Sequence, residues 1–176
     1  MNIDISLRAL ALALLAGASV TALAQPRTNA AAAAPFVGQG QGPGYHDPRS
    51  PFKPLEEKEG VLPWALLGSV TTAIDKKKIV PTFPAAVQAL HQQKVKVQGF
   101  MMPLEPGDKQ KHFLLSSVPT SCNFCVPAGP EGLIEIRSTV PVRYTLEPVV
   151  MEGLLAVLKD DPYGLFYRVV EAKLVN

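Results

Sequence analysis

The sequence predicts a mostly β domain, a small, partly open barrel of five to six strands with one short helix, behind a disordered N-terminal region. Segments in which apolar and polar residues alternate recur from residue 61 onward, which is the period of a strand with one buried face. Seventeen Pro and thirteen Gly among 176 residues indicate many turns. Apolar residues make up 47% of the chain, which is enough for one buried core.

The charge balance argues against one class of partner. Lys and Arg number 17, Asp and Glu number 15, and the formal net charge is +2. Such a chain lacks the basic surface that binds a phosphate backbone, so we predict that it does not bind nucleic acid.

Residues 1–24 have the pattern of a secretory signal peptide. Arg8 precedes an apolar run over residues 9–16, which is too short to span a membrane. Small residues at Ala22 and Ala24 indicate cleavage after Ala24. We therefore expect a periplasmic or secreted protein whose mature chain has no membrane span. The alternative is an N-terminal anchor that is not cleaved.

Residues 25–60 are predicted to be a flexible linker rich in Pro, Gly and Ala. An alanine run covers residues 30–34, and glycines alternate with other residues over 38–44. Few large apolar residues are present to offset the entropy lost on ordering. The folded domain is accordingly expected over residues 61–176.

The first elements of this domain are predicted to be a strand over residues 63–70 and a short helix over residues 82–90. Pro84 suits the first turn of that helix, and apolar residues three apart share one of its faces. The three lysines at 76–78, between the two elements, indicate solvated surface.

The remaining strands carry the barrel. Over residues 94–98 the valines are expected to point inward and Lys and Gln outward, and the strand continues past a bend at Gly99. A turn at 106–108 leads to the return strand. The later strands are expected over 112–116, 132–137, 149–158 and 165–175, with a hairpin loop at 159–164. Closure by a glycine bend favours an OB-type barrel, with an irregular sandwich or an α+β roll as alternatives.

The two cysteines of the chain, Cys122 and Cys125, are spaced C-x-x-C in a proline-rich segment. In an oxidising compartment two thiols this close can form a disulfide, which would pin the loop. Thioredoxin-type redox catalysis requires a helix after the motif, and Pro127 and Pro130 disfavour one.

A metal site is the other interpretation of this pair. Two thiolates suit zinc or cuprous copper but supply only half of a site. His112, on the strand that leads into the loop, is the best placed third ligand among the histidines. Met101 and Met102 could donate thioethers to copper, although core filling is the commoner role of methionine in an apolar strand.

Motifs of common catalytic sites are absent from the sequence. It contains no H-E-x-x-H, no G-x-S-x-G and no glycine-rich phosphate loop that opens a helix. Asp160 and Asp161 precede Pro162 and are interpreted as turn residues, not as a catalytic carboxylate pair. We therefore predict a protein that is not an enzyme.

Two segments resemble a known family. The sequence GFMMPL at 99–104 and the sequence SCNFCVP at 121–127 resemble the pattern G-F-M-x-P-L … S-C-x-F-C-x-P of bacterial exported proteins catalogued as domain-of-unknown-function family 3299. The resemblance extends over most of residues 64–176. It implies an exported OB-type β-barrel without an established activity.

The resemblance also bears on partners and on the cysteines. Some family members are encoded beside ABC-transporter components and metal-uptake genes, which implies an ABC-transporter component or another envelope protein as partner. Many members have C-x-H followed by a proline run where this chain has Cys122 and Cys125. A Cys/His alternation favours a metal or polar contact over a disulfide, because His cannot form one.

These observations lead to two main hypotheses. In the first, an exported periplasmic binding protein holds zinc or copper through Cys122 and Cys125, with His112 or a methionine, as a trafficking factor or transporter accessory. In the alternative, the chain is a protein-interaction module in which the two cysteines form a structural disulfide. A thiol–disulfide enzyme is a third hypothesis.

Overall fold

The computed structural model describes residues 44–76, 78–123, 125–127 and 129–175. All of them fall within one compact unit, Ala34–Asn176. The predicted signal peptide (1–24) and residues 25–43 of the predicted linker lie outside the described residues. In the described part of the chain, no helix has the length and apolar character needed to cross a bilayer.

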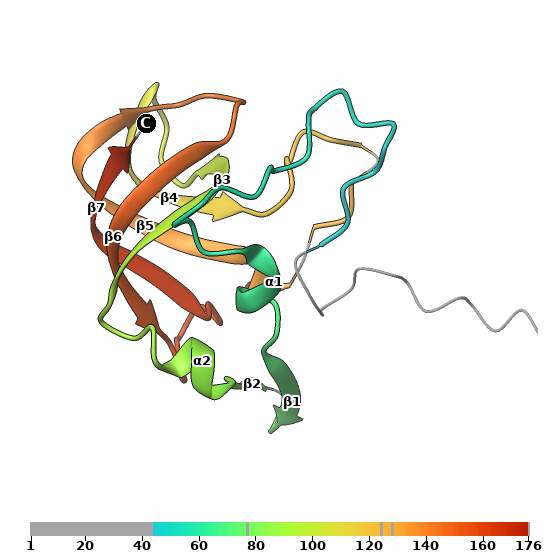
Figure 1. The fold of residues 1–176 in the computed structure, drawn as a ribbon, viewed down its shortest axis with the longest axis vertical. Coiled ribbons are helices and arrows are strands. Elements are labelled where there is room, and N and C mark those ends of the chain that lie inside the picture. Colours follow the sequence, from blue (N-terminus) through green and yellow to red (C-terminus); the bar gives the residue numbers. More distant parts are fainter. Residues whose placement is uncertain (1–43, 77, 124, 128, 176) are drawn as a thin grey trace, which may run out of the picture. The chain divides into compact units, whose positions relative to one another are not determined.

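Five strands form a closed barrel, and the fold is mostly β as predicted (Figure 1). The strands are β3 (Lys94–Pro103), β4 (Lys109–Ser116), β5 (Leu133–Arg143), β6 (Val149–Val157) and β7 (Tyr167–Val175). They pair in the order β3-β4-β5-β7-β6, and β6 pairs back onto β3. The β5–β7 pair is parallel and the other pairs are antiparallel. The sequence suggested a partly open barrel. The barrel is closed, because β5 also pairs with β7.

Closure depends on a bend in β3 at Gly99, as predicted. Up to Gly99 this strand pairs with β6, and from Phe100 onward it pairs with β4. A Cβ atom at Gly99 would lie 2.7 Å from the carbonyl oxygen of Ser116, which is too close for any side chain. Only glycine lets the two strands approach at this point, so one strand can serve both sides of the barrel.

Alternating side chains fill the barrel. Strand β6 shows the pattern most clearly, since every second residue from Val149 to Val157 is buried. The valines of β3, Val95 and Val97, point inward as predicted. At one end Phe83, Phe166 and Tyr167 pack edge to face, with ring centroids 5.8–6.5 Å apart.

Two short helices and a 3-10 turn accompany the barrel. Helix α2 (Ala85–Gln88) confirms the predicted short helix, and the 3-10 helix η1 covers Pro130–Gly132. The strand expected over residues 63–70 is wrong, because α1 (Trp64–Leu67) occupies its centre. A short apolar run does not distinguish a buried strand from a buried helix. Here Trp64 and Leu67 are three apart and are buried on one side of α1.

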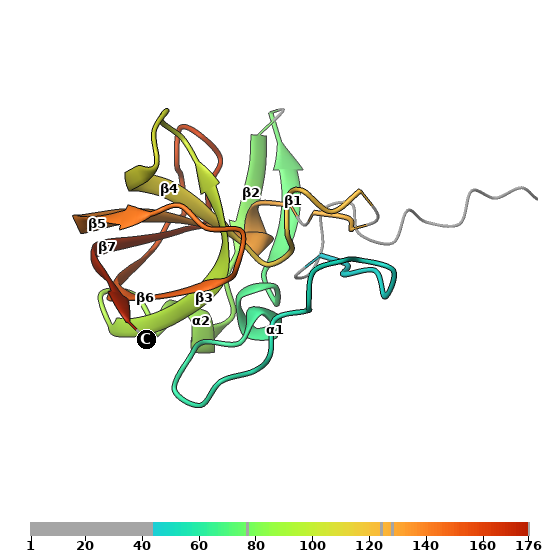
Figure 2. The same cartoon turned by 90° about the horizontal axis from the view of Figure 1, so that it is seen from above.

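A two-stranded sheet that the sequence did not predict lies outside the barrel. It is a hairpin of β1 (Thr71–Asp75) and β2 (Lys78–Thr82), and nearly all its residues are exposed. Lys76, at its turn with a positive φ of 47°, and Lys78, the first residue of β2, are both exposed, in line with the solvated surface expected there; Lys77 lies outside the described residues. Figure 2 shows this hairpin standing beside the barrel.

Residues 44–63, here called the N-terminal segment, run over the outer side of β3. The Leu62 N–H donates to the Lys96 carbonyl (2.9 Å), and the Gln98 side-chain amide donates to the Glu56 carbonyl (2.6 Å). Gln98 therefore points outward as predicted and is nevertheless only 6% exposed. This contrasts with the unpacked linker expected up to residue 60. The reason is that Leu55 and Leu62 find apolar surface to pack against.

Candidate binding site beside the disulfide loop

The structure joins Cys122 and Cys125 in a disulfide, with their Cα atoms 5.4 Å apart. The bond closes a tight turn, because the Cys125 N–H also donates to the Cys122 carbonyl (3.3 Å). These residues belong to the segment between β4 and η1, residues 117–129, here called the disulfide loop. The disulfide interpretation of the C-x-x-C spacing agrees with this geometry.

The disulfide loop is anchored on two sides. Val126 and Tyr45 exchange two backbone hydrogen bonds of 2.9 Å, which tie the loop to the N-terminal segment. The hydroxyl of Ser116 in β4 donates to the Val118 carbonyl (2.7 Å), and the Ser117 N–H donates to the carbonyl of Gly132 in η1 (3.1 Å), which tie the loop to the barrel and to η1. The loop and the N-terminal segment therefore hold each other in place.

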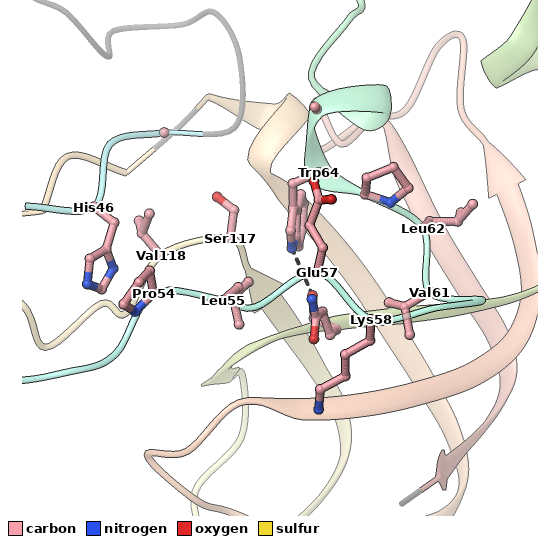
Figure 3. A pocket seen from close by; sticks show the side chains of 14 residues that line it. His46, Pro54, Leu55, Glu57, Lys58, Val61, Leu62, Trp64, Ser117 and Val118 are labelled. Carbon is pink, nitrogen blue, oxygen red and sulfur yellow. Dashed lines mark hydrogen bonds between the residues drawn. The ribbon is translucent and has the colours of Figure 1, made fainter.

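Between them lies a hollow of about 370 Å³ (Figure 3). Its apolar lining comes from three elements: the N-terminal segment, α1 and the start of the disulfide loop. The residues are Pro54, Leu55, Val61, Leu62, Pro63, Trp64, Ala65 and Val118. Glu57 and Lys58 stand exposed at its rim. A concave apolar surface with a few polar groups is the usual form of a ligand or anchor-residue site.

Gln98 braces this hollow from the barrel side. Its backbone carbonyl accepts a hydrogen bond from the Trp64 indole N–H (2.9 Å), while its side-chain amide donates to the backbone carbonyl of Glu56. Figure 3 shows the indole ring standing in the wall of the hollow. Because one β3 residue fixes both α1 and the N-terminal segment, the hollow exists before any partner arrives.

His46 brings a polar group to the edge of the hollow. Its Nε2 lies 2.9 Å from the Phe52 carbonyl, which assigns the ring proton to Nε2. Its Nδ1 is then a buried acceptor, and no described residue donates a hydrogen bond to it. Next to it, Arg49 donates to the Asp47 carboxylate through its side chain and its backbone N–H, which lowers the pKa of Asp47 to about 2. The ion pair shapes the turn that presents His46.

His112, the predicted third metal ligand, has a carboxylate partner in this structure. His112 Nε2 lies 2.8 Å from Oε1 of Glu135, so this histidine takes part in a separate cluster on the outside of the barrel. The described residues contain no group of three His, Cys, Asp or Glu side chains that could hold an ion. Zinc or copper binding by Cys122 and Cys125 stays a prediction, and it would need the disulfide to be reduced.

The two methionines differ in their surroundings. Met101 is 3% exposed and belongs to the hydrophobic core, which is the core-filling role that its strand position favoured. Met102 is half-buried on the other side of β3.

The cluster around His112 is one that sequence reasoning missed. Glu135 of β5 accepts hydrogen bonds from Arg137 (2.9 Å), from Arg168 of β7 and from His112. Burial alone would raise the pKa of Glu135, but these hydrogen bonds outweigh it and hold the pKa below its usual value. Arg168 also donates to Asp161 (3.1 Å), the turn residue of the β6–β7 loop. The sequence does show a charged residue, Glu135, between Ile134 and Ile136 in a strand. Which cations face it follows only from the register of β5 with β4 and β7.

Comparison with known proteins identifies the family of this chain. The family model described as protein of unknown function (DUF3299) matches residues 67–164, which is 98 of the 176 residues. The chain belongs to the DUF3299 family. This confirms the family that the sequence resembles.

Among solved structures, this DUF3299 protein is similar to a crystal structure of a family member from Pseudomonas aeruginosa PAO1. The two share 18% sequence identity, with a TM-score of 0.39, over 55% of this chain and 68% of the other. Among curated proteins, none matches this chain.

Proposed function

We propose that this DUF3299 protein is a protein-interaction module of the bacterial cell envelope, and that the hollow between the N-terminal segment and the disulfide loop receives its partner. The observation that carries the proposal is the apolar hollow itself, to which the disulfide loop contributes Ser117 and Val118, ahead of the turn that the Cys122–Cys125 bond closes. In this role the sulfurs stabilise a shape and take no part in chemistry.

The lining of the hollow supports this kind of partner. Leu55, Trp64 and Val118 offer apolar surface to one or two side chains of an inserted segment. The exposed Glu57 and Lys58 at the rim offer polar groups to such a segment. Interfaces are commonly held by such an apolar anchor in a pocket with a polar rim.

The compartment is part of the proposal. A disulfide persists where the environment is oxidising, and residues 1–24 have the pattern of an export signal. We propose that the protein resides in the periplasm. Its partner there is an envelope protein, with an ABC-transporter component as the candidate that the family resemblance suggests.

A photo-crosslinking side chain at the position of Lys58, on the rim of the hollow, tests the proposal in cells that export the protein. The matched control carries the same side chain at Lys111, an exposed lysine of β4 that does not line the hollow. We expect a discrete envelope protein to be captured from position 58 and not from position 111.

Binding measurements with the purified partner complete the test. Leu55→Asp places a charge in the apolar wall and is expected to weaken binding at least about tenfold. Cys122→Ala/Cys125→Ala is expected to keep binding at temperatures where that variant is folded. Equal capture from both positions, or unchanged affinity of the folded Leu55→Asp variant, would contradict the proposal.

A further inference from the structure

The β1–β2 hairpin exposes large apolar side chains. Ile74 is 82% exposed and Ile79 is 54% exposed. They are register partners, so they lie side by side on one face of the hairpin. Val80, on the other face, is 40% exposed. An isolated two-stranded hairpin is only marginally stable in water, which makes such exposure costly without a partner surface.

Positive charge surrounds this apolar pair. Lys76 and Lys78 flank the end of the hairpin, and the acidic residues near them are Asp75 and Asp160. Lys78 Nζ lies 3.6 Å from a carboxylate oxygen of Asp160, but both side chains are largely exposed, at 75% and 84%. An exposed pair of this kind contributes little and exchanges readily with other partners. The hairpin tip is therefore apolar and cationic together.

The neighbouring β6–β7 loop adds an aromatic residue. A hollow of about 390 Å³ joins the hairpin to this loop, with Ile79 and Pro81 on one side and Leu158 and Tyr163 on the other; its charged lining is mixed, with Lys78 and Lys159 beside Asp160 and Asp161. Tyr163 is 84% exposed. Tyrosine is enriched where an apolar phase meets water, because its ring is apolar and its hydroxyl is polar.

We propose that the tip of the β1–β2 hairpin docks on an anionic lipid surface. Ile74 and Ile79 enter the boundary between headgroups and acyl chains, Tyr163 lies at headgroup level, and the lysines pair with lipid phosphates. Charge complementarity argues for this occupant, because aliphatic side chains beside clustered lysines are what an anionic bilayer interface accepts. The hairpin also stands beside the barrel, with β1 and β2 extending away from α1 and α2 (Figure 2).

This docking is independent of the hollow proposed to receive a protein partner. None of the hairpin residues lines that hollow. A failure of one proposal therefore leaves the other untouched, and variants at the two places separate them.

Vesicle sedimentation tests the lipid proposal with protein purified from the periplasm. The mass of each purified variant is measured to verify that all of them share the same N-terminus. Vesicles contain either phosphatidylcholine alone or about 30% phosphatidylglycerol. We expect binding to the anionic vesicles only, and its loss in about 0.5 M NaCl, where the Debye length is about 4 Å. Ile74→Ser/Ile79→Ser and Lys76→Glu/Lys78→Glu are each expected to weaken binding at least about tenfold.

Matched variants keep the result interpretable. Leu146→Ser removes an apolar residue that is 54% exposed, as Ile79 is, from the β5–β6 connection, and Lys109→Glu/Lys111→Glu reverses the same charge on β4. Both controls should bind like the parent protein, and thermal unfolding should show an intact barrel in every variant. Equal sedimentation with neutral and anionic vesicles, or wild-type binding by the hairpin variants, would overturn the proposal. Absence of vesicle binding would overturn it too, and would direct the search to a protein that contacts the hairpin.

Discussion

Removal of the disulfide is the perturbation that most directly tests how the candidate site is built. We consider Cys122→Ala/Cys125→Ala, because Cys122 is only 6% exposed and a serine hydroxyl there would add a burial cost. The bond closes a ring of four residues, for which the chain-entropy relation predicts a loss of about 2 kcal/mol in the free energy of unfolding. For a domain of this size that corresponds to a fall in melting temperature of about 6–8 °C.

The assay is thermal and urea unfolding of the oxidised protein and the variant, followed by circular dichroism. Amide hydrogen exchange supplies a local measurement: the Tyr45 and Val126 amides, which bond to each other's carbonyls, should exchange faster in the variant than amides of β6. Two free thiols in the protein purified from an oxidising compartment would refute the reasoning. So would equal stability of the two proteins, because the bond would then constrain nothing.

Three further predictions concern the barrel exterior, the N-terminal segment and metal. The lowered pKa of Glu135 means that its ion pairs stabilise the fold above the unfolded value of 4.5 and lose this effect as pH falls through the lower folded value. Glu135→Gln should therefore lower the free energy of unfolding by about 3 kcal/mol at pH 7 and by less in acid. Urea unfolding of both proteins across this pH range measures the difference, and a difference that does not change with pH would contradict the prediction. Gln98→Leu should cost about 1 kcal/mol and speed proteolysis within residues 44–63, and unchanged cleavage rates would show that Gln98 does not brace this segment. If Cys122 and Cys125 bind metal, the reduced protein will hold about one zinc or copper ion, with loss in the double alanine variant. A metal content near zero before and after substitution contradicts that prediction.

Local pattern was sufficient for most of the barrel. The strands β3 to β7 were predictable because alternation of apolar and polar residues records which face of a strand is buried, and this is a property of each segment alone. The bend at Gly99 was predictable for a similar reason, since glycine in a strand interior marks a close approach of backbone. Elements without a clear alternation could not be predicted in this way. Residues 63–70 were predicted as a strand and contain the helix α1, and the hairpin β1–β2 was not predicted at all.

The candidate site was only half predictable. A spacing of three residues brings two cysteines within bonding reach, and the sequence therefore pointed to Cys122 and Cys125 as a pair. It could not choose between a bond and a metal, because the third ligand has to come from elsewhere in the chain. His112 had no visible partner in the sequence, and the pairing of β4 with β5 places it against Glu135.

The sequence by itself determined the barrel strands β3 to β7, the glycine bend and the proximity of the two sulfurs, because each follows from residues close together along the chain. Only the tertiary structure decided that the barrel closes through β5 and β7, that Gln98 is covered by the N-terminal segment, and that a hollow forms beside the disulfide loop. These features join residues tens of positions apart. Their stability comes from apolar contacts and hydrogen bonds that exist only once the strands are in register.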